Sequence, residues 1–239
     1  MIKIVDLKKS FDGDMVLDGV NLTIPGEKIT VILGRSGTGK TVLMKHIIGL
    51  LKPDSGSIFV DGKDIAAMDD DELDLIRSHF SMLFQGGALF DSINVFDNIA
   101  FPLREREKIS AKDVEKVVTQ RISEVGLTGM ERKMPAELSG GMIKRVGLAR
   151  ALITKPEVIL FDEPTAGLDP ITEDSITQLI LQTHKKSPTT FIIISHDIDF
   201  TFEIADKIAI LHKGKIIAEG TASEIKKTKD PFIRNYFSG

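Results

Sequence analysis

The sequence predicts an α/β fold in which a core of buried strands carries an antiparallel β part and a helical insertion. An apolar run at residues 29–33 leads into a glycine-rich loop and then into a helical pattern. Two further apolar runs, at residues 158–161 and 191–194, end in polar side chains and are typical of buried strands. Between the run at residues 29–33 and the run at residues 158–161, residues 88–151 are helical in character.

Length and composition indicate a globular chain of one large domain or two small ones. Of its 239 residues, 42% are hydrophobic and 28% are charged, which is ordinary for a protein with a real core. The net charge of −4 offers no general attraction to DNA or RNA, so we expect no nucleic-acid partner. Because the chain has no cysteine, disulfides and thiolate chemistry are excluded.

No segment of the sequence is expected to cross a membrane. Residues 1–6 alternate polar and apolar side chains, which is unlike a secretory signal. No run approaches the roughly 18 apolar residues that span a bilayer. If the protein works at a membrane, we therefore expect another chain to hold it there.

The strongest single motif is the glycine-rich loop at residues 34–41. It has a glycine, four free positions and then Gly-Lys-Thr, which is the phosphate-loop pattern, and it lies between a predicted strand and a predicted helix. Its glycines allow tight turns that present N–H groups to an anion, and the helix start adds partial positive charge. The lysine is expected to reach the β- and γ-phosphates and the threonine hydroxyl to ligate Mg²⁺. The residues that predict binding of a nucleoside triphosphate are Gly34, Arg35, Ser36, Gly37, Thr38, Gly39, Lys40 and Thr41.

An aromatic side chain precedes a predicted turn near the N-terminus. Residues 2–7 and 16–24 are apolar segments that predict antiparallel strands, with turn residues between them. Phe11, just before this turn, is suited to stacking on an adenine ring. From this segment alone, a place in the core is an equally good interpretation of Phe11.

Two polar features flank the strand predicted at residues 81–84. Before it, the acidic run 69–72 is interpreted as a solvated first turn of a helix rather than as a metal site. After it, Gln85 and two glycines suit a side chain held at a site by a loop able to move. Taken alone, this glutamine gives only weak support for a site.

The helical insertion contains two predicted helix starts. Ser110 begins a capping-box pattern, and helical periodicity follows it. Ser139 is expected to cap a second helix, while Gly140 and Gly141 keep its start open for an anion. This second start is either an ordinary capped helix or a second grip on phosphate, and both interpretations remain open.

Two carboxylates end the apolar strand at residues 158–161. In phosphate-loop ATPases an aspartate at this place holds Mg²⁺, which is the role expected for Asp162. Glu163 is expected to orient and deprotonate the attacking water. Because neighbours on a strand point to opposite faces, the two side chains can take different roles.

A further buried strand, at residues 191–195, repeats this design and ends at His196. Its imidazole is expected to contact the γ-phosphate or the attacking water. The alternative is a histidine whose hydrogen bonds are satisfied within the core.

The C-terminal part of the sequence predicts a hairpin, a helix and a tail. Residues 208–211 and 216–218 flank a Lys-Gly pair, which indicates a hairpin. Thr221 then begins what is expected to be the final helix. The aromatic segment 231–237 is interpreted either as a docking contact or as a frayed end.

Together, the two candidate phosphate grips, the strand-end carboxylates, Gln85 and His196 resemble the nucleotide-binding subunits of ABC transporters. The resemblance covers essentially the whole chain, and its most specific motif is Leu138-Ser139-Gly140-Gly141, which most other phosphate-loop enzymes lack. It implies an α/β, RecA-like ATPase core with an antiparallel β subdomain and an inserted helical subdomain. It also implies ATP and Mg²⁺ as ligands, with hydrolysis of ATP to ADP and phosphate coupled to transport.

The resemblance implies a role for each motif. Catalytic roles fall to three residues, with the first as the base: Glu163, His196 and Lys40. The implied Mg²⁺ ligands are Thr41, Gln85 and Asp162. The nucleotide is bound by residues 34–41, known in the family as the Walker A loop, and by Phe11, where the family more often has tyrosine. The second grip, from another copy of the chain, consists of Ser139, Gly140 and Gly141.

Several segments look like the Mla/Mce branch of this family, which moves phospholipids and other lipids across the envelope. Met142 stands where most of the family has glutamine, which removes one polar side chain but leaves the contacts of Ser139 and Gly141 intact. The resemblance therefore implies phospholipid transport between the membranes of a Gram-negative-type envelope. The segments that carry it are residues 84–90, 94–105, 139–150 and 169–172.

The resemblance also implies an assembly. We expect a homodimer bound to integral membrane permease subunits on the cytoplasmic side of the inner membrane, with a small regulatory subunit as a further candidate partner. In the family, a helix of the membrane protein docks beside residues 85–103. The alternatives are the ATPase subunit of another ABC importer or exporter, a non-transport ABC ATPase, and a small-molecule kinase, which would not need the second grip.

The predicted domain organisation is a single domain over residues 1–239. Residues 1–87 and 152–220 are expected to form the nucleotide-binding core with its β subdomain. Residues 88–151 are expected to form the helical subdomain, and residues 221–239 the C-terminal helix and tail.

Overall fold

A computed structural model describes residues 1–106, 109–187 and 189–238 of the chain. The chain divides into two compact units: unit 1 holds residues 1–80 and 188–239, and unit 2 holds residues 81–187. The boundaries between these units lie at other positions than the subdomain boundaries expected from the sequence. The expected subdomains stay a prediction. Gly239, the last residue of the expected C-terminal piece, lies outside the described residues.

The N-terminal part of unit 1 is an antiparallel sheet with the strand order β2-β1-β4-β5. Its strands are β1 (Ile2–Phe11), β2 (Asp14–Ile24), β4 (Ser55–Val60) and β5 (Lys63–Asp64). β1 and β2 pair antiparallel, with Phe11 opposite Asp14, as the sequence predicted. Asp12 and Gly13 join them with φ angles of 50° and 90°. Two left-handed residues match the twist of a tight hairpin, which explains an aspartate and a glycine at this turn.

A second group of strands in unit 1 has the order β10-β9-β3-β8. The strands are β3 (Ile29–Leu33), β8 (Thr190–Ser195), β9 (Lys207–His212) and β10 (Lys215–Gly220). β3 pairs parallel with both β8 and β9, whereas β9 and β10 form the predicted hairpin. All residues of β3 and β8 are buried, as in sheets covered on both faces. The continuous apolar runs in the sequence reflect this two-sided burial.

Two helices of unit 1, α2 and α8, begin at residues that the sequence marks as caps. Asp69 caps α2 in a capping box with Glu72, so the acidic run is a helix start, as predicted. Thr221 caps α8 in the same way. The helices are α1 (Lys40–Ile47), the 3₁₀ turn η1 (Ile65–Ala67), α2 (Asp70–Ser78), α7 (Ile198–Ile204), α8 (Ala222–Lys226) and α9 (Pro231–Ser238).

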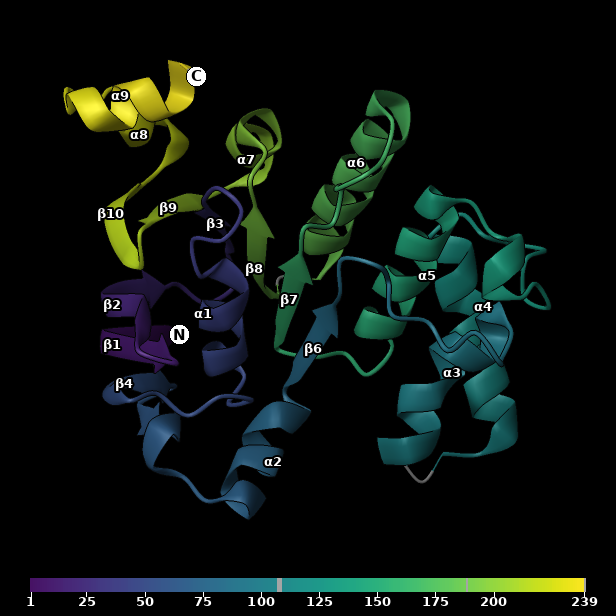
Figure 1. Ribbon diagram of the computed structural model, residues 1–239. Coiled ribbons are helices and arrows are strands. Elements are labelled where there is room, and N and C mark those ends of the chain that lie inside the picture. Colours follow the sequence, from purple (N-terminus) through teal and green to yellow (C-terminus); the bar gives the residue numbers. More distant parts are fainter. Residues whose placement is uncertain (107–108, 188, 239) are drawn as a thin grey trace. The chain divides into compact units, whose positions relative to one another are not determined.

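The C-terminal tail is helical, which the sequence analysis did not predict. α9 follows α8, and both lie at the C-terminal end of the ribbon (Figure 1). Ile233 is 5% exposed and belongs to a core cluster with Leu33 and Ile225, against which Tyr236 also packs. The interpretation of this tail as a frayed end is therefore wrong, because apolar side chains of α9 are buried within unit 1.

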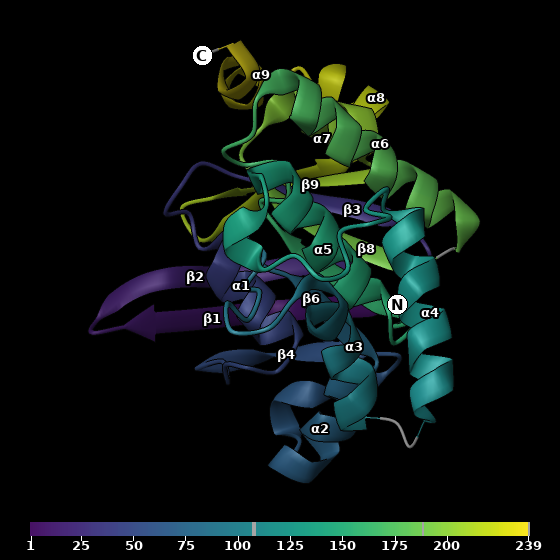
Figure 2. The same cartoon turned by 90° about the vertical axis from the view of Figure 1, so that its right-hand side faces the viewer.

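Unit 2 combines two strands with a group of helices. β6 (Phe80–Leu83) runs into this unit and is the neighbour of β7 (Val158–Asp162), and the two arrows point the same way in Figure 1. The helices α3, α4 and α5 lie side by side (Figures 1 and 2). The helical elements of unit 2 are α3 (Val95–Arg106), α4 (Ala111–Glu124), the 3₁₀ turn η2 (Pro135–Glu137), α5 (Gly140–Leu152) and α6 (Pro170–Lys186).

Side-chain caps also begin the helices of unit 2. The hydroxyl oxygens of Ser110 and Ser139 accept hydrogen bonds from Asp113 N and Met142 N at the starts of α4 and α5, and Asp169 caps α6. These two serine caps were predicted. Throughout the described parts of the chain, every helix is too short or too polar to reach from one side of a bilayer to the other.

Candidate active site

The glycine-rich loop follows β3 in unit 1 and is closed by its own lysine. Lys40 is 6% exposed, and its ammonium group donates to Gly34 O at 2.7 Å and to Arg35 O at 3.2 Å. Gly34 N donates to Ser195 O at 3.1 Å, which ties the loop to the end of β8. The predicted phosphate-binding lysine thus spans the inside of its own loop, as expected for a residue that reaches phosphates held there.

Two glycines of this loop are required by close approach. A Cβ added to Gly34 would lie 2.7 Å from Thr38 Oγ1 and 2.8 Å from Leu211 O. Gly39 has a φ of 99°, and an added Cβ would lie 3.0 Å from Val16 O. Because Gly39 has no side chain to cap α1, the helix presents its first backbone N–H groups and partial positive charge to the loop. This arrangement fits an anion such as a phosphate group.

Phe11 and His196 both lie at the surface of unit 1. Phe11 is 41% exposed at the end of β1, with Lys9 Nζ 5.5 Å from its ring centroid. His196 is exposed directly after β8, and Leu33 is paired with Ser195, so Gly34 and His196 leave the same edge of the strands. The core alternatives for both side chains are therefore wrong. Their roles at a nucleotide stay predictions.

Arg35 of the loop contacts the C-terminal helix, which the sequence did not indicate. The guanidinium carbon of Arg35 lies 5.8 Å from the centroid of the Tyr236 ring. Burial raises the pKa of the Tyr236 hydroxyl, while Arg35 opposes this shift through its charge and a backbone hydrogen bond. A cation over an aromatic face is attractive, so α9 is linked to the phosphate loop.

In unit 2, β7 ends at Asp162, and Glu163 leaves the strand with a φ of 51°. Both side chains are half-buried. The sequence analysis attributed their separation to the alternating pleat of one strand. Glu163 lies beyond the last residue of β7 and has a left-handed backbone, so the alternation along the strand does not determine where its side chain points, and the separate roles of the two carboxylates stay a prediction. Non-glycine residues in this conformation cluster at functional sites.

The loop after β6 carries the exposed Gln85. Within the loop, Gly87 N donates to Phe84 O at 2.8 Å. The guanidinium of Arg150 on α5 donates to Gly87 O and to Ala88 O, each at 2.8 Å. The sequence analysis predicted a loop able to move here, which stays a prediction; in the structure its main chain accepts hydrogen bonds from α5.

Lys144 on α5 adds a second link. It is 5% exposed, and its ammonium group donates to Gln85 O and to Glu163 O, the latter at 3.2 Å. Burial lowers the pKa of Lys144, while the negative charges of Asp162 and Glu163 oppose this shift. Lys144 therefore connects the main chains of two predicted site residues.

The start of α5 carries the second predicted grip. Ser139 and Gly140 are exposed, and Ser139 Oγ accepts from Met142 N at 3.3 Å. A Cβ added to Gly141 would lie 2.5 Å from Thr172 Cγ2, so a larger residue there would have to displace the Thr172 side chain. The helix is capped in the ordinary way, and its exposed start also leaves the serine hydroxyl at the surface. An ordinary capped helix and a second grip on phosphate are therefore compatible with each other at the start of α5.

The predicted Mg²⁺ ligands have the right chemistry for that ion. Thr41, Gln85 and Asp162 offer hydroxyl, amide and carboxylate oxygens, and Mg²⁺ prefers oxygen ligands. Among the residues described, no group of three or more acidic, histidine or cysteine side chains is placed to hold a metal ion. A donor set of this kind suits an ion held largely by the phosphates of a nucleotide.

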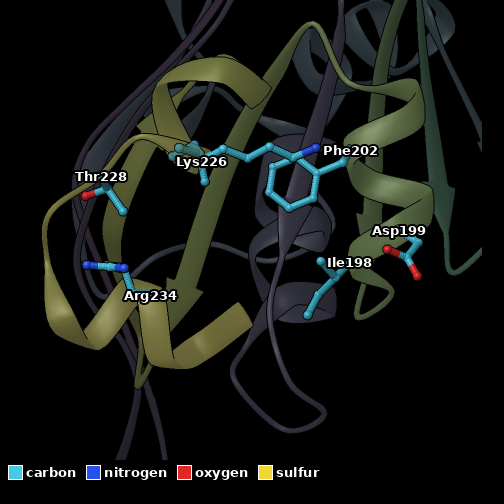
Figure 3. Close-up of a pocket in the computed structure, with 7 residues that line it drawn as sticks. Ile198, Asp199, Phe202, Lys226, Thr228 and Arg234 are labelled. Carbon is cyan, nitrogen blue, oxygen red and sulfur yellow. The ribbon is translucent and has the colours of Figure 1, made fainter. Parts of the chain in front are cut away.

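A cavity of about 370 Å³ lies elsewhere in unit 1, beside α7, α8 and α9 (Figure 3). Lys226 Nζ lies 4.4 Å from the centroid of the Phe202 ring at its wall. None of the predicted nucleotide-binding residues lines this cavity. Its lining residues are Ile198, Asp199, Phe202, Ile225, Lys226, Thr228 and Arg234.

The residues that the sequence analysis missed act through long-range contacts. Lys144 and Arg150 bind carbonyls of distant loops, and Tyr236 contacts the phosphate loop. The one signal for the first two is that cationic residues, Arg145 among them, occur in a helix that is otherwise rich in small and apolar residues. No local pattern marks Tyr236 beyond its position as the single tyrosine of the chain.

Relatives of known sequence and structure carry the same architecture. A sequence profile of the ABC transporter family matches residues 17–166. The intermembrane phospholipid transport system ATP-binding protein MlaF of Escherichia coli is 43% identical over 224 residues, covering 94% of this chain and 83% of MlaF. The protein named "Probable ribonucleotide transport ATP-binding protein mkl" of Mycobacterium tuberculosis is 42% identical over 238 residues, covering 100% of this chain. The chain spans 66% of the length of that mycobacterial relative.

A solved structure agrees with these sequences. The ATP-binding cassette MJ0796, as a dimer in a post-hydrolysis state bound to ADP and phosphate, matches with a TM-score of 0.85. It is 30% identical and covers 93% of this chain and 99% of its own. The chain therefore belongs to the ABC transporter family, and the predicted resemblance and fold class are confirmed.

Proposed function

We propose that this protein is the ATP-hydrolysing motor subunit of a lipid-transporting ABC complex. The single observation that carries the proposal is the phosphate loop, in which the buried Lys40 and two sterically required glycines form a grip for phosphate. Family membership supports ATP as the ligand. Lys40 binds the β- and γ-phosphates there, and Phe11 stacks on the adenine ring.

The oxygen donors Thr41, Gln85 and Asp162 hold Mg²⁺ in this proposal. Mg²⁺, when bound with ATP, neutralises charge on the β- and γ-phosphate oxygens. The chain itself then positions the nucleotide through the N–H groups of loop 34–41 and through Lys40. Positioning and electrostatic stabilisation provide most of the catalysis in this class of reaction.

Proton transfer falls to Glu163, assisted by His196. The Glu163 carboxylate accepts a proton from the water that attacks the γ-phosphate, and ADP and phosphate leave as products. The exposed imidazole of His196 contacts the γ-phosphate or the water. General-base catalysis contributes about 10²–10⁴-fold to rates of this kind.

We further propose that the second grip acts on ATP held by another copy of the chain. The exposed Ser139 and Gly140 at the start of α5 support this role, because they are accessible to a partner. Binding of ATP then favours the homodimer, and loss of phosphate lets the two copies part. The differential contact with the γ-phosphate drives this switch.

Phospholipid is the proposed cargo, and integral membrane permease subunits are the proposed partners. The name of MlaF, an intermembrane phospholipid transport ATP-binding protein, supports a lipid, whereas the name of mkl refers to ribonucleotide transport. The chain would work at the cytoplasmic side of the inner membrane, with a small regulatory subunit as a further partner. Mass spectrometry of the complex purified in detergent distinguishes the cargoes: bound phospholipid supports the proposal, and bound ribonucleotide other than ATP and ADP overturns the lipid assignment.

The ATPase activity is tested by phosphate release from ATP by the purified protein, with and without Mg²⁺. We expect Mg²⁺-dependent release that is lost in a Lys40→Ala variant at low ATP concentration. Release no faster than in a protein-free control, in the presence of the membrane subunits, would overturn the motor function.

A further inference from the structure

One helix of unit 2, α5, holds the loop that carries Gln85. Arg150 donates to carbonyls of this loop. Because Gly147 has no side chain, the loop can lie close to the helix. A Cβ added to Gly147 would lie 2.5 Å from Leu83 Cδ1, and one added to Gly87 would lie 2.7 Å from a methyl carbon of Ile143. The loop after β6 therefore packs directly on α5, without space for larger residues.

Lys144 extends this hold to the end of β7. Its ammonium group donates to Gln85 O and to Glu163 O, so the two carbonyls share one cation. The side chain is buried, with 5% of its surface exposed. The two peptide units are thus kept at the separation that a single ammonium group allows. Lys144 therefore links the main chain of Gln85, the predicted Mg²⁺ ligand, to the main chain of Glu163, the predicted base.

Both loops contain a strained residue that is held by a cation of α5. Ala88 has a φ of 46° and Glu163 a φ of 51°. Such a conformation costs about 1–3 kcal/mol for a non-glycine residue and persists only where surrounding contacts hold it. Arg150 donates to Ala88 O at 2.8 Å, and Lys144 donates to Glu163 O at 3.2 Å. The same helix therefore stabilises both unusual backbone geometries.

Stability alone does not account for a lysine at this position. Removing a charged group from water is unfavourable, and well-packed apolar residues of similar volume often replace buried charges at no loss of stability. An apolar side chain, however, has no N–H group to hold the Gln85 and Glu163 carbonyls. A packing role and a positioning role for Lys144 can therefore be separated by experiment.

We propose that Lys144 is a positioning residue for hydrolysis, which fixes the main chain at Glu163 relative to that at Gln85. This inference rests on the proposed ATPase function. It needs no contact between Lys144 and the nucleotide. Its consequence is that loss of the ammonium group lowers turnover and raises the Mg²⁺ requirement, while the affinity for ATP changes little.

Variants at two neighbouring positions of α5 test this role in the full-length protein. Lys144→Met keeps the length of the side chain but removes its donors, whereas Lys144→Arg keeps several donors. Arg145→Met is the matched control, because Arg145 donates to Val125 O and to Ser175 Oγ, each at 2.6 Å, and neither residue is a predicted site residue. For each variant we would measure kcat, KM for ATP, the Mg²⁺ concentration for half-maximal activity, and Tm.

We expect Lys144→Met to lower kcat by about 10- to 100-fold, as misplacement of a catalytic group does. Its KM for ATP should stay within about threefold of wild type, because binding energy from the phosphate loop is retained. The half-saturating Mg²⁺ concentration should rise, and Lys144→Arg should recover most of kcat. Arg145→Met should lower Tm and change kcat by less than about twofold.

Wild-type kcat in Lys144→Met, or a loss no larger than that of Arg145→Met at the same folded fraction, would overturn the positioning role. If Lys144→Met does not fold, Lys144→Leu, which likewise has no donor to offer the Gln85 and Glu163 carbonyls, is measured by the same criteria. Wild-type kcat and Mg²⁺ dependence in that variant would also overturn it. Failure of the wild-type protein itself to hydrolyse ATP would instead overturn the proposed function, so the two failures are distinguishable.

Discussion

The phosphate loop of unit 1 and the site loops of unit 2 are held in place by different means. In the phosphate loop, Thr38 and Lys40 donate to carbonyls three to six residues away in the sequence. In unit 2, Lys144 and Arg150 donate to carbonyls that are 19 to 63 residues away. The first loop is shaped by its own residues, whereas the others depend on a helix that is distant in the sequence.

On the proposed residue roles, this difference separates nucleotide binding from turnover. A loop shaped by local contacts keeps its grip on phosphate when distant parts of the chain change. Loops aligned by α5 keep their catalytic geometry only while that helix holds them. We therefore expect variants in the phosphate loop of unit 1 to change the affinity for ATP, and variants at Glu163 and at its contacts with α5 in unit 2 to change the rate of hydrolysis.

The largest effect is expected for Glu163→Gln in unit 2. Removal of the general base should lower turnover by about 10²–10⁴-fold. ATP should still bind, because the phosphate loop is untouched. Steady-state phosphate release and equilibrium ATP binding check both parts, with Glu157→Gln as a control for an exposed carboxylate before β7. Wild-type turnover in Glu163→Gln would rule out its role as the base.

A smaller effect, on affinity, is expected for Lys40→Ala in unit 1. Loss of a charged hydrogen-bond donor costs about 1.5–3 kcal/mol, which corresponds to a roughly 10- to 150-fold weaker affinity for ATP. Isothermal titration calorimetry measures this change. Lys45→Ala, at an exposed position of the same helix, should bind ATP as wild type does. An unchanged affinity in Lys40→Ala would contradict the phosphate-binding role of Lys40.

A further test concerns the contact between α9 and the phosphate loop. Tyr236→Ala removes the ring that Arg35 faces, and an exposed cation–π contact is worth about 0.5–1 kcal/mol. We therefore expect an approximately two- to fivefold weaker affinity for ATP. Tyr236→Phe keeps the ring and should behave nearly as wild type. If both variants bind ATP equally well, α9 does not support the loop, and its role as a docking contact for a partner remains.

The smallest effect is expected in acid. Burial lowers the pKa of His46 from its ordinary value of 6.5, with opposing contributions from Asp54 and from a hydrogen bond to Val42 O. Because the folded state disfavours the protonated imidazole, the unfolded state binds more protons below pH 6.5, and stability is lost as pH falls from there. Nδ1 lies 2.7 Å from Val42 O.

Thermal unfolding measures this acid effect. Between neutral pH and about pH 5, we expect Tm to fall further in the wild-type protein than in His46→Gln, by about 2–4 °C for each kcal/mol lost. His79→Gln, at an exposed position after α2, is the control and should keep the pH dependence of the wild type. An identical fall in His46→Gln would show that other groups set the acid sensitivity.

The sequence predicted best those features that neighbouring residues determine. The parallel strand at residues 29–33, the glycines of the phosphate loop and the serine cap of α5 are all specified locally, and each is present. Their sequence patterns state the physical requirement directly: continuous burial, left-handed backbone or a capping hydroxyl. The placement of Asp162 at the end of β7 follows from the same reasoning.

The features that the sequence did not predict depend on tertiary contacts. α9 is helical because Ile233 and Tyr236 pack on a cluster assembled from distant residues. The left-handed backbone of Glu163 has no signature in its apolar strand, and Lys144 becomes informative only when its two acceptors are seen together. The local sequence of a segment does not determine which distant residues it will contact.

The central claim is that ATP is enclosed by the phosphate loop of one copy and the start of α5 of another. The most direct test is the mass of the Glu163→Gln variant, measured by light scattering with Mg²⁺ and either ATP or ADP. The same measurement is made on the double variant Glu163→Gln with Ser139→Arg. The account predicts a dimer mass with ATP, a monomer mass with ADP, and a monomer for the Ser139 variant in both. An ATP-bound protein that stays monomeric, or a Ser139 variant that dimerises equally well, would contradict it.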